Sequence, residues 1–326
     1  TFACAKPGLL FDPGKRYAGE VLVRDIGIGF DAGEEETPWY GSVEKEDLDR
    51  FLTRTPMGNK GTFGKVLVLA GSGAMCGAAV LCARAVLASG AGMVKVVTEE
   101  RNRTPLFCAL PEAMADFWNE DEPLPEEALL QDLAWADAVV AGPGLSKSRT
   151  AKELLVFTVQ HTEVPLVLDA DALNLIAEDA EILSGCRAEK ILTPHVGELA
   201  RLLHMTIAEC QRDPAGSAGR AAEKYQACCV RKDSVTVTAE EGREQYYINT
   251  SGSSALATAG SGDVLAGITG AFAAKRQCEK NEKKISLAKT AALAAYAHGK
   301  AGEAAEEKSS ASYVTASEII RGLQSI

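Results

Sequence analysis

The sequence predicts an α/β protein whose mostly parallel central sheet is covered by helices on both faces. One reason is a repeated order of apolar strand, polar loop and helix that begins near Lys60. A second is that the strands are continuous apolar runs, as in parallel strands buried on both sides. A third is that glycine, aspartate or histidine follows several strands. Such loops meet at the edge of a parallel sheet where ligands bind.

The N-terminal part of the chain differs from this pattern. Residues 1–30 are predicted to form a short extended unit with a strand at Glu20–Ile26, because that stretch is apolar and β-branched. Residues 31–59, acidic and turn-rich at the start, are predicted to be a linker. The globular domain is therefore expected to span residues 60–326.

Within this domain the elements follow one another along the chain. The expected strand segments are Lys65–Ser72, Met93–Thr98, the start of Ala136–Leu145, the start of Pro165–Ile176, the start of Lys190–Leu203, and a hairpin over Asp233–Thr250 that turns at Glu241-Gly242. The expected helices are Ala78–Ser89, the end of Lys190–Leu203, one that starts near Asp263, Lys289–Lys300 and Thr315–Ser325.

The stretch Asn249–Ala274 carries the strongest chemical signal. Gly260-Ser261-Gly262-Asp263 stands before apolar residues at helical spacing. Glycines let a backbone turn sharply and approach a ligand closely. The unpaired N–H groups and the positive dipole end of the helix that follows make a site for phosphate. We expect the dipole to keep Asp263 ionised, so that it can take a proton from an attacking hydroxyl.

A structural alternative exists, in which Asp263 is an N-cap of a glycine-rich turn. Other polar groups favour the functional interpretation, since they also follow strands and are expected at one edge of the sheet. They are Gly71-Ser72, Gly142-Pro143-Gly144, Asp169, Asp171 and Thr193-Pro194-His195. Each alone is typical of a turn, but together they predict a binding site.

Composition excludes several classes of function. The 326-residue chain has a formal net charge of −11, which argues against nucleic acid and anionic membranes as partners. A local anion site remains compatible with this charge. The nine cysteines form no C-x-x-C pair, so the chain is expected to carry reduced thiols, no metal site and a cytoplasmic location. No apolar run reaches the length that spans a membrane.

Five segments, in this order, strongly resemble the ADP/ATP-dependent NAD(P)H-hydrate dehydratases, a branch of the ribokinase-like superfamily. They are KGTFGKVLVLAGS, GPGL, LDADALNL, LTPHVGELARL and GSGDVLAG. The resemblance runs from about Lys60 to the C-terminus and implies a ribokinase-like three-layer α/β/α fold. Residues 1–30 resemble the closing strands of the NAD(P)H-hydrate epimerase domain. The chain is therefore expected to be the C-terminal part of a bifunctional repair enzyme.

The resemblance implies a carbon–oxygen lyase that acts on NADH or NADPH hydrated at C6, in the S form. In the family, ADP or ATP phosphorylates the C6 hydroxyl, and the ring nitrogen then expels phosphate, which is a better leaving group than hydroxide. The implied co-substrate is ADP or ATP, with Mg²⁺ accompanying the nucleotide. The implied partners are the hydrated dinucleotide, an epimerase domain, fused or separate, and further copies of the chain, since the family suggests a tetramer.

Site residues are carried over from the family position by position. Asp263 matches the catalytic base and also contacts the substrate. The nucleotide-binding positions are Lys232, Asp233, Ser234, Val235, Thr236, Gly260 and Gly262, and the substrate-binding positions are Ala78, Gly142, Gly144 and His195. Asp233 replaces a glycine usual in the family, which puts the shape of that loop in doubt.

Some residues keep two interpretations. Asp169 and Asp171 either orient water or Mg²⁺ near the phosphates or anchor turns, and His195 either lines the pocket or packs in its loop. His161, His204 and His298 are expected to be structural. The main alternative function is a small-molecule kinase of the same fold, which would accumulate a stable phosphoester. A non-enzymatic nucleotide-binding module is the third hypothesis, but it has no need of the Asp263 carboxylate.

Overall fold

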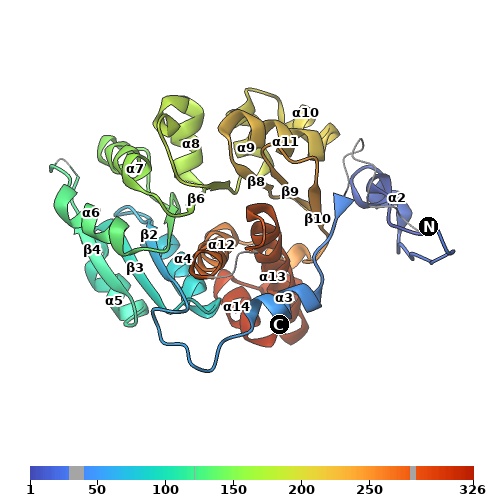
Figure 1. The fold of residues 1–326 in the computed structure, drawn as a ribbon, viewed down its shortest axis with the longest axis horizontal. Helices are drawn as coiled ribbons and strands as arrows, with labels where there is room; N and C mark the ends of the chain where they lie inside the picture. The colour runs from blue at the N-terminus through green and yellow to red at the C-terminus, as the bar shows by residue number, and fades with distance from the viewer. Residues whose placement is uncertain (29–39, 121, 280–283) are drawn as a thin grey trace.

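The computed structural model describes residues 1–28, 40–120, 122–279 and 284–326. Its centre is a ten-stranded sheet in the order β1-β10-β9-β8-β7-β6-β5-β2-β3-β4 (Figure 1). The strands are β1 (Tyr40–Gly41), β2 (Lys65–Leu69), β3 (Met93–Glu99), β4 (Met114–Trp118), β5 (Ala138–Ala141), β6 (Leu166–Leu168), β7 (Lys190–Leu192), β8 (Cys228–Arg231), β9 (Thr236–Glu240) and β10 (Tyr246–Asn249).

Only β9 runs against its neighbours in this sheet. It pairs antiparallel with both β8 and β10, whereas the other neighbouring strands are parallel. The predicted hairpin is confirmed, with Gly242 in its turn at a φ of +65°. The mostly parallel sheet predicted from the strand–loop–helix repeat is also confirmed.

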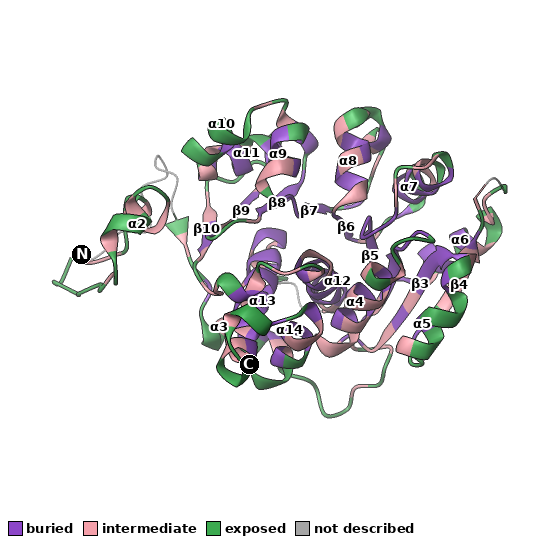
Figure 2. Ribbon diagram, turned by 180° about the vertical axis from the view of Figure 1, so that it is seen from behind, coloured by how far each residue is buried: buried purple, intermediate pink, exposed green. Residues whose placement is uncertain are grey.

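Helices cover both faces of the sheet, so the fold has three layers (Figure 1). One face carries α3 (Lys45–Leu52), α4 (Cys76–Ala88), α5 (Arg103–Ala109), α12 (Ser261–Cys278), α13 (Leu287–Lys308) and α14 (Ala316–Gly322). The other carries α6 (Glu126–Trp135), α7 (Arg149–His161), α8 (Asp171–Glu178), α9 (Val196–Leu203), α10 (Ile207–Arg212) and α11 (Pro214–Tyr225). Buried residues gather on the strands and on the helix sides that face them (Figure 2).

Small residues explain how closely α12 lies against its neighbours. A Cβ built on Gly267 would come within 2.3 Å of the Cys82 carbonyl oxygen on α4. A Cβ on Gly270 would come equally close to Val140 on β5, at 2.3 Å. Both distances are far below a normal contact, so a larger residue would push α12 off the sheet. The position of the α12 N-terminus therefore depends on these glycines.

The N-terminal prediction is wrong in its secondary structure. Glu20–Ile26 forms no strand, and only an isolated bridge joins Arg24 to Phe2. The preceding residues form two short helices, α1 (Pro7–Leu10) and α2 (Gly14–Ala18). An apolar, β-branched segment becomes a strand only when neighbouring strands pair with it, and the described residues offer Arg24 just this one bridge.

The segment expected to be a linker also contains structure. Its residues 29–39 lie outside the described part of the chain. After them, β1 adds to β10, and α3 buries Leu48 and Phe51 in the main core. The Phe51 ring stacks at an angle on Phe272 of α12, with centroids 4.9 Å apart. Residues 45–52 are therefore part of the packed domain.

Among the helices that the structure describes, none combines the length and the apolar character needed to span a bilayer.

Candidate active site

The loops predicted to carry function do meet at one edge of the sheet. Asp169 follows β6, His195 follows β7 and Lys232 follows β8, and these strands run in parallel. The loop after β7 even bridges to the loop after β8, between His195 and Lys232. The N-terminus of α12 faces the same edge, since a Cβ built on Gly262 would lie 3.6 Å from Lys232 Nζ.

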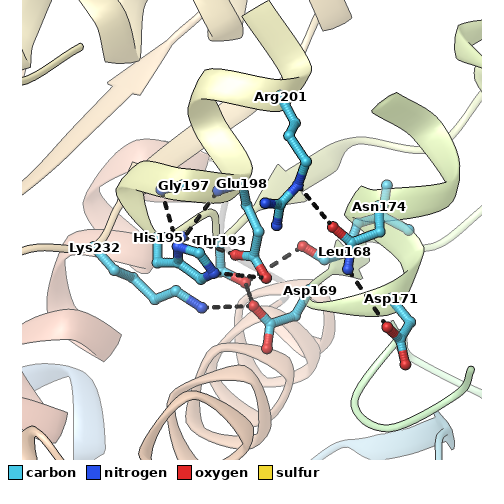
Figure 3. A network of polar contacts seen from close by, with 10 residues as sticks. All are labelled: Leu168, Asp169, Asp171, Asn174, Thr193, His195, Gly197, Glu198, Arg201 and Lys232. Carbon is cyan, nitrogen blue, oxygen red and sulfur yellow. Dashed lines mark hydrogen bonds and ion pairs between the residues drawn. The ribbon is translucent and has the colours of Figure 1, made fainter. Parts of the chain in front are cut away.

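Asp169 is the centre of a polar network at this edge (Figure 3). Its Oδ1 accepts hydrogen bonds from Lys232 Nζ and from Thr193 Oγ1, both at 2.7 Å. Asp169 is only 1% exposed. Burial favours a neutral Lys232, but the nearby carboxylates of Asp169 and Glu198 outweigh it and raise the Lys232 pKa. The site therefore holds a positive charge beside the phosphate-binding turn.

Asp263 lies in the first turn of α12 and is not its N-cap. Gly260 occupies the cap position at a φ of +86°. Burial, and then repulsion from Asp169, raise the Asp263 pKa to about 6, against a weaker lowering by Lys232. The expected ionised state of Asp263 is therefore opposed by burial, which favours the protonated form. At pH 7 the group is still mostly ionised, and a base with a pKa near the working pH transfers protons efficiently.

The turn at the start of α12 requires glycine at positions 260 and 262, for different reasons. Gly260 adopts a left-handed φ, and a Cβ there would lie 2.5 Å from Leu81 Cδ1 and 3.0 Å from Ala316 Cβ. Gly262 has room for a Cβ, but it would project toward Lys232 and Asp169 Oδ2, which is 3.9 Å away. A side chain at this position would occupy the space between the free amides and the lysine. The amides and the Lys232 ammonium make this space suited to an anion such as a phosphoryl group.

The predicted substrate-side residues also lie together. Gly142, at a φ of +123°, approaches Asp169 so closely that a Cβ would come within 1.9 Å of its carbonyl oxygen. Gly144, at a φ of +58°, packs against Ala78, with 2.8 Å between a built Cβ and the Ala78 Cβ. These glycines bring the loop after β5 against the start of α4 and the loop after β6. The structure thus gathers Ala78, Gly142 and Gly144 beside Asp169.

His195 caps helix α9 with its ring. Nδ1 accepts from the backbone N–H of Gly197 at 3.0 Å and of Glu198 at 3.4 Å, so the proton of the neutral ring is on Nε2. Burial, followed by the charges of Lys232 and Arg201, lowers the His195 pKa. His195 is therefore a neutral ring held by the helix that it caps, with Nε2 3.4 Å from Glu198 Oε1.

Glu198 was missed by the sequence reasoning. It completes the capping box by accepting from the His195 N–H at 2.9 Å, and its side chain is buried. Burial, offset in part by Lys232, raises the Glu198 pKa to about 7. The capping pattern of His195 and Glu198, three residues apart, was visible in the sequence, but the perturbed pKa depends on the packing around it.

The predicted nucleotide segment starts at the network and leads away from it. Lys232 lies in the network, Val235 is buried and Thr236 begins β9. Asp233 is exposed, accepts from Ser234 N at 2.8 Å and pairs with Arg231 at 3.0 Å. It is not among the residues with a positive φ. The replacement of the usual glycine by Asp233 therefore demands no strained backbone.

Asp169 and Asp171 were each given two interpretations, and the structure favours a different one for each residue. Asp171 Oδ2 accepts from Ser146 N at 2.8 Å, and it opens α8 after Ala170, whose φ is +48°. These contacts favour the turn-anchoring role for Asp171. Asp169 instead faces Lys232 and α12, as a functional residue would. Within the described ranges, no three His, Cys, Asp or Glu side chains gather as a metal site would require.

His298 was expected to be structural, yet it touches the phosphate-binding turn. It lies buried on α13, with Nε2 at 3.1 Å from Ser261 Oγ. Burial, then the Lys232 charge, lower the His298 pKa to about 4, so the ring is neutral at physiological pH. The other two follow the expectation: His161 Nδ1 contacts Phe157 O within α7, and His204 ends α9 in the left-handed conformation.

Cavity volume alone does not locate this site. A cavity of about 830 Å³ lies at the other edge of the sheet, where it is lined by Met93 at the start of β3, by the end of α4 and by α14. None of the predicted site residues lines it. The concentration of perturbed carboxylates and free helix amides identifies the site instead.

Comparisons with known proteins identify the family of the chain. A family described as NAD(P)H-hydrate dehydratase matches residues 66–325. The ADP-dependent (S)-NAD(P)H-hydrate dehydratase of Neisseria meningitidis is 36% identical, over 79% of this chain and 82% of that enzyme. The bifunctional NAD(P)H-hydrate repair enzyme Nnr of Moorella thermoacetica is also 36% identical, over 94% of this chain. The match spans only 57% of the length of that relative.

A solved structure gives the same result for the fold. The ADP/ATP-dependent NAD(P)H-hydrate dehydratase of Bacillus subtilis, co-crystallised with ATP and Mg²⁺, superposes with a TM-score of 0.72 at 29% identity. The match covers 87% of this chain and 96% of that one. The ribokinase-like fold predicted from the sequence is therefore confirmed, and the chain belongs to the NAD(P)H-hydrate dehydratase family.

Proposed function

We propose that the protein uses ADP or ATP to dehydrate the S form of NADH or NADPH hydrated at C6, and so restores the reduced cofactor. The observation that carries this proposal is a half-buried carboxylate, Asp263, in the first turn of a helix whose amides face a protonated lysine, Lys232. Asp263 removes the proton of the C6 hydroxyl, which then attacks the terminal phosphate. The electron pair of the ring nitrogen then expels that phosphate from C6, and loss of a proton from C5 forms the C5=C6 double bond of the reduced cofactor.

The phosphoryl group lies between the amides of Gly260 and Gly262 and the ammonium of Lys232. The nucleotide continues along Asp233, Ser234, Val235 and Thr236, and Mg²⁺ accompanies its phosphates. Mg²⁺ keeps several water ligands and binds through phosphate oxygens and one or two carboxylates. One carboxylate beside the phosphates, that of Asp169, suits such an ion. The hydrated nicotinamide enters past Ala78, Gly142, Gly144 and His195.

The test is incubation of the purified protein with hydrated NADH and either nucleotide. The proposal requires release of free phosphate together with NADH, which regains its absorbance near 340 nm. A stable phosphoester in place of NADH would instead identify a small-molecule kinase. That outcome is the main alternative, because Asp263 and the anion site serve a kinase equally well. The same comparison made with ADP and with ATP determines the donor.

The proposal extends to the surroundings of this domain. Residues 1–30 belong to the end of an epimerase domain and 60–326 form the dehydratase domain, to which β1 and α3 of the connecting segment are added. Support comes from large apolar side chains that are exposed in the first 28 residues, where another domain would cover them: Phe2, Tyr17, Leu22, Val23, Ile26 and Ile28. The protein is expected in the cytoplasm as a homo-oligomer, a tetramer as in the family, and light scattering measures the number of subunits.

A further inference from the structure

A second cavity borders the site and has no role in the proposed chemistry. It is a groove of about 760 Å³ between α8 and α9, lined by Asn174, Ala177, Gly197 and Arg201, among others. Gly197 lies in the helix start that His195 caps, so one end of the groove opens beside the site. Drug-sized ligands occupy cavities of this order of volume. The reacting ring needs only the space at Asp263, which leaves the groove free for the rest of a long substrate.

The charges in the groove suit an anion. Arg201 points from α9 toward the network around Asp169 (Figure 3), and its Nε donates to Asn174 Oδ1 at 3.1 Å. Its Nη1 lies 3.9 Å from a Cβ built on Gly197. In the described part of the chain Arg201 takes part in no ion pair, although its charge lowers the pKa of His195 and of Glu198. The guanidinium is therefore held in position without an ion-pair partner among the described residues, and its planar fork suits a phosphate.

A second cation lies in the groove but is already paired. Lys147 Nζ is 2.7 Å from Glu178 Oε1, and both side chains are more than half exposed. This pair adds no net charge, so Arg201 gives the groove its positive character. The protein as a whole is strongly acidic, with a net charge of −11, which makes a local cation beside the site more selective for an anion.

We propose that the groove between α8 and α9 binds the phosphate-bearing adenosine half of the hydrated dinucleotide, with Arg201 holding a phosphate. This inference rests on the proposed function, because it names the place of the part of the substrate that does not react. The nicotinamide then lies at Asp263 and the chain of phosphates passes His195 and Gly197 into the groove. The nucleotide donor approaches from the opposite side, along Lys232–Thr236.

The experiment compares two substrates and three variants. Hydrated NADH carries both halves, whereas the hydrate of reduced nicotinamide riboside carries the same ring without any phosphate or adenosine. Arg201→Gln removes the charge, Ala177→Phe narrows the groove, and Arg187→Gln removes an exposed arginine outside it. Each variant is assayed for KM and kcat with both substrates, and its Tm is measured.

We expect Arg201→Gln to raise the KM for hydrated NADH about tenfold, the effect of losing one charge-assisted hydrogen bond. Ala177→Phe should also raise this KM, because the larger side chain fills part of the groove. For the riboside hydrate, both variants should keep the KM of the unmodified protein. Arg187→Gln should keep the KM and kcat of the unmodified protein with both substrates. An unchanged KM for hydrated NADH in both variants overturns the inference. An equal loss with the riboside also overturns it, since Arg201 would then act on the reacting ring. If the unmodified protein dehydrates neither substrate, the proposed function fails instead.

Discussion

Replacing Asp263 with Asn should make the protein more stable while it stops turnover. The Asp263 pKa is raised from 3.8 to about 6 in the folded state, mainly by burial. Between these pH values the folded state binds more protons than the unfolded state, so stability falls as the pH rises from about 4 to about 6. A shift of roughly two units corresponds to about 3 kcal/mol of destabilisation at pH 7. The Asn variant avoids this penalty.

Urea unfolding at several pH values measures the effect. The Asn variant should gain up to about 3 kcal/mol above pH 6, and its advantage should disappear below about pH 4. Turnover should fall by about 10²–10⁴-fold, as expected for the loss of a general base. In the unmodified enzyme, kcat/KM should rise with pH up to about 6 as Asp263 loses its proton.

Asp47 provides a control for which replacement by Asn should change the stability in the opposite direction. Its pKa is lowered, chiefly by the hydrogen bond from Lys289 at 2.8 Å, so its charged form stabilises the fold at neutral pH. Asp47→Asn should therefore lose stability at pH 7 and keep its turnover. The reasoning is refuted if Asp263→Asn is less stable than the unmodified protein at pH 7. It is also refuted if the difference in unfolding free energy between the two proteins is the same at pH 4 as at pH 7, because burial would then not destabilise the charged carboxylate.

Three other predictions concern ligand binding and positioning. His195→Ala should weaken binding of the hydrated dinucleotide more than that of ADP or ATP, and Thr236→Val should do the reverse; calorimetric titration that finds the opposite order would exchange the two pockets. His298→Leu should lower kcat about fivefold through the lost contact with Ser261, whereas His298→Gln retains activity; equal loss in both, or in neither, contradicts the positioning role. Deletion of residues 1–30 should leave turnover per folded molecule unchanged, and a selective loss in a truncated protein that still melts cooperatively would contradict this.

The sequence predicted the parts of the site that depend on local pattern. Apolar runs, glycines after strands and the position of Asp263 were sufficient to place the polar loops at one edge of a parallel sheet, because such strands end at the same edge. The prediction of a strand at Glu20–Ile26 is wrong for a related reason. Strand propensity reports the capacity to pair, and the described residues supply only one bridge to that segment.

The electrostatics of the site depend on packing and were not predictable in this way. Asp263 and Glu198 owe their raised pKa values mainly to burial, which no local pattern reveals. The contact between His298 and Ser261 joins the consecutive helices α12 and α13, and it depends on how these two helices pack. Arg201 was likewise invisible as a binding residue, since only the spacing of α8 and α9 opens the groove beside it.

The contact of Gly260 with Ala316 has a consequence for the synthesis of the protein. Ala316 is the first residue of α14, and its Cβ lies 3.0 Å from the position that a Cβ on Gly260 would take. During translation Gly260 leaves the ribosome before α14 exists. Until α14 has been synthesised, the side of the turn that faces Ala316 lacks this neighbour, so we expect the nascent chain to reach its full affinity for nucleotide only afterwards.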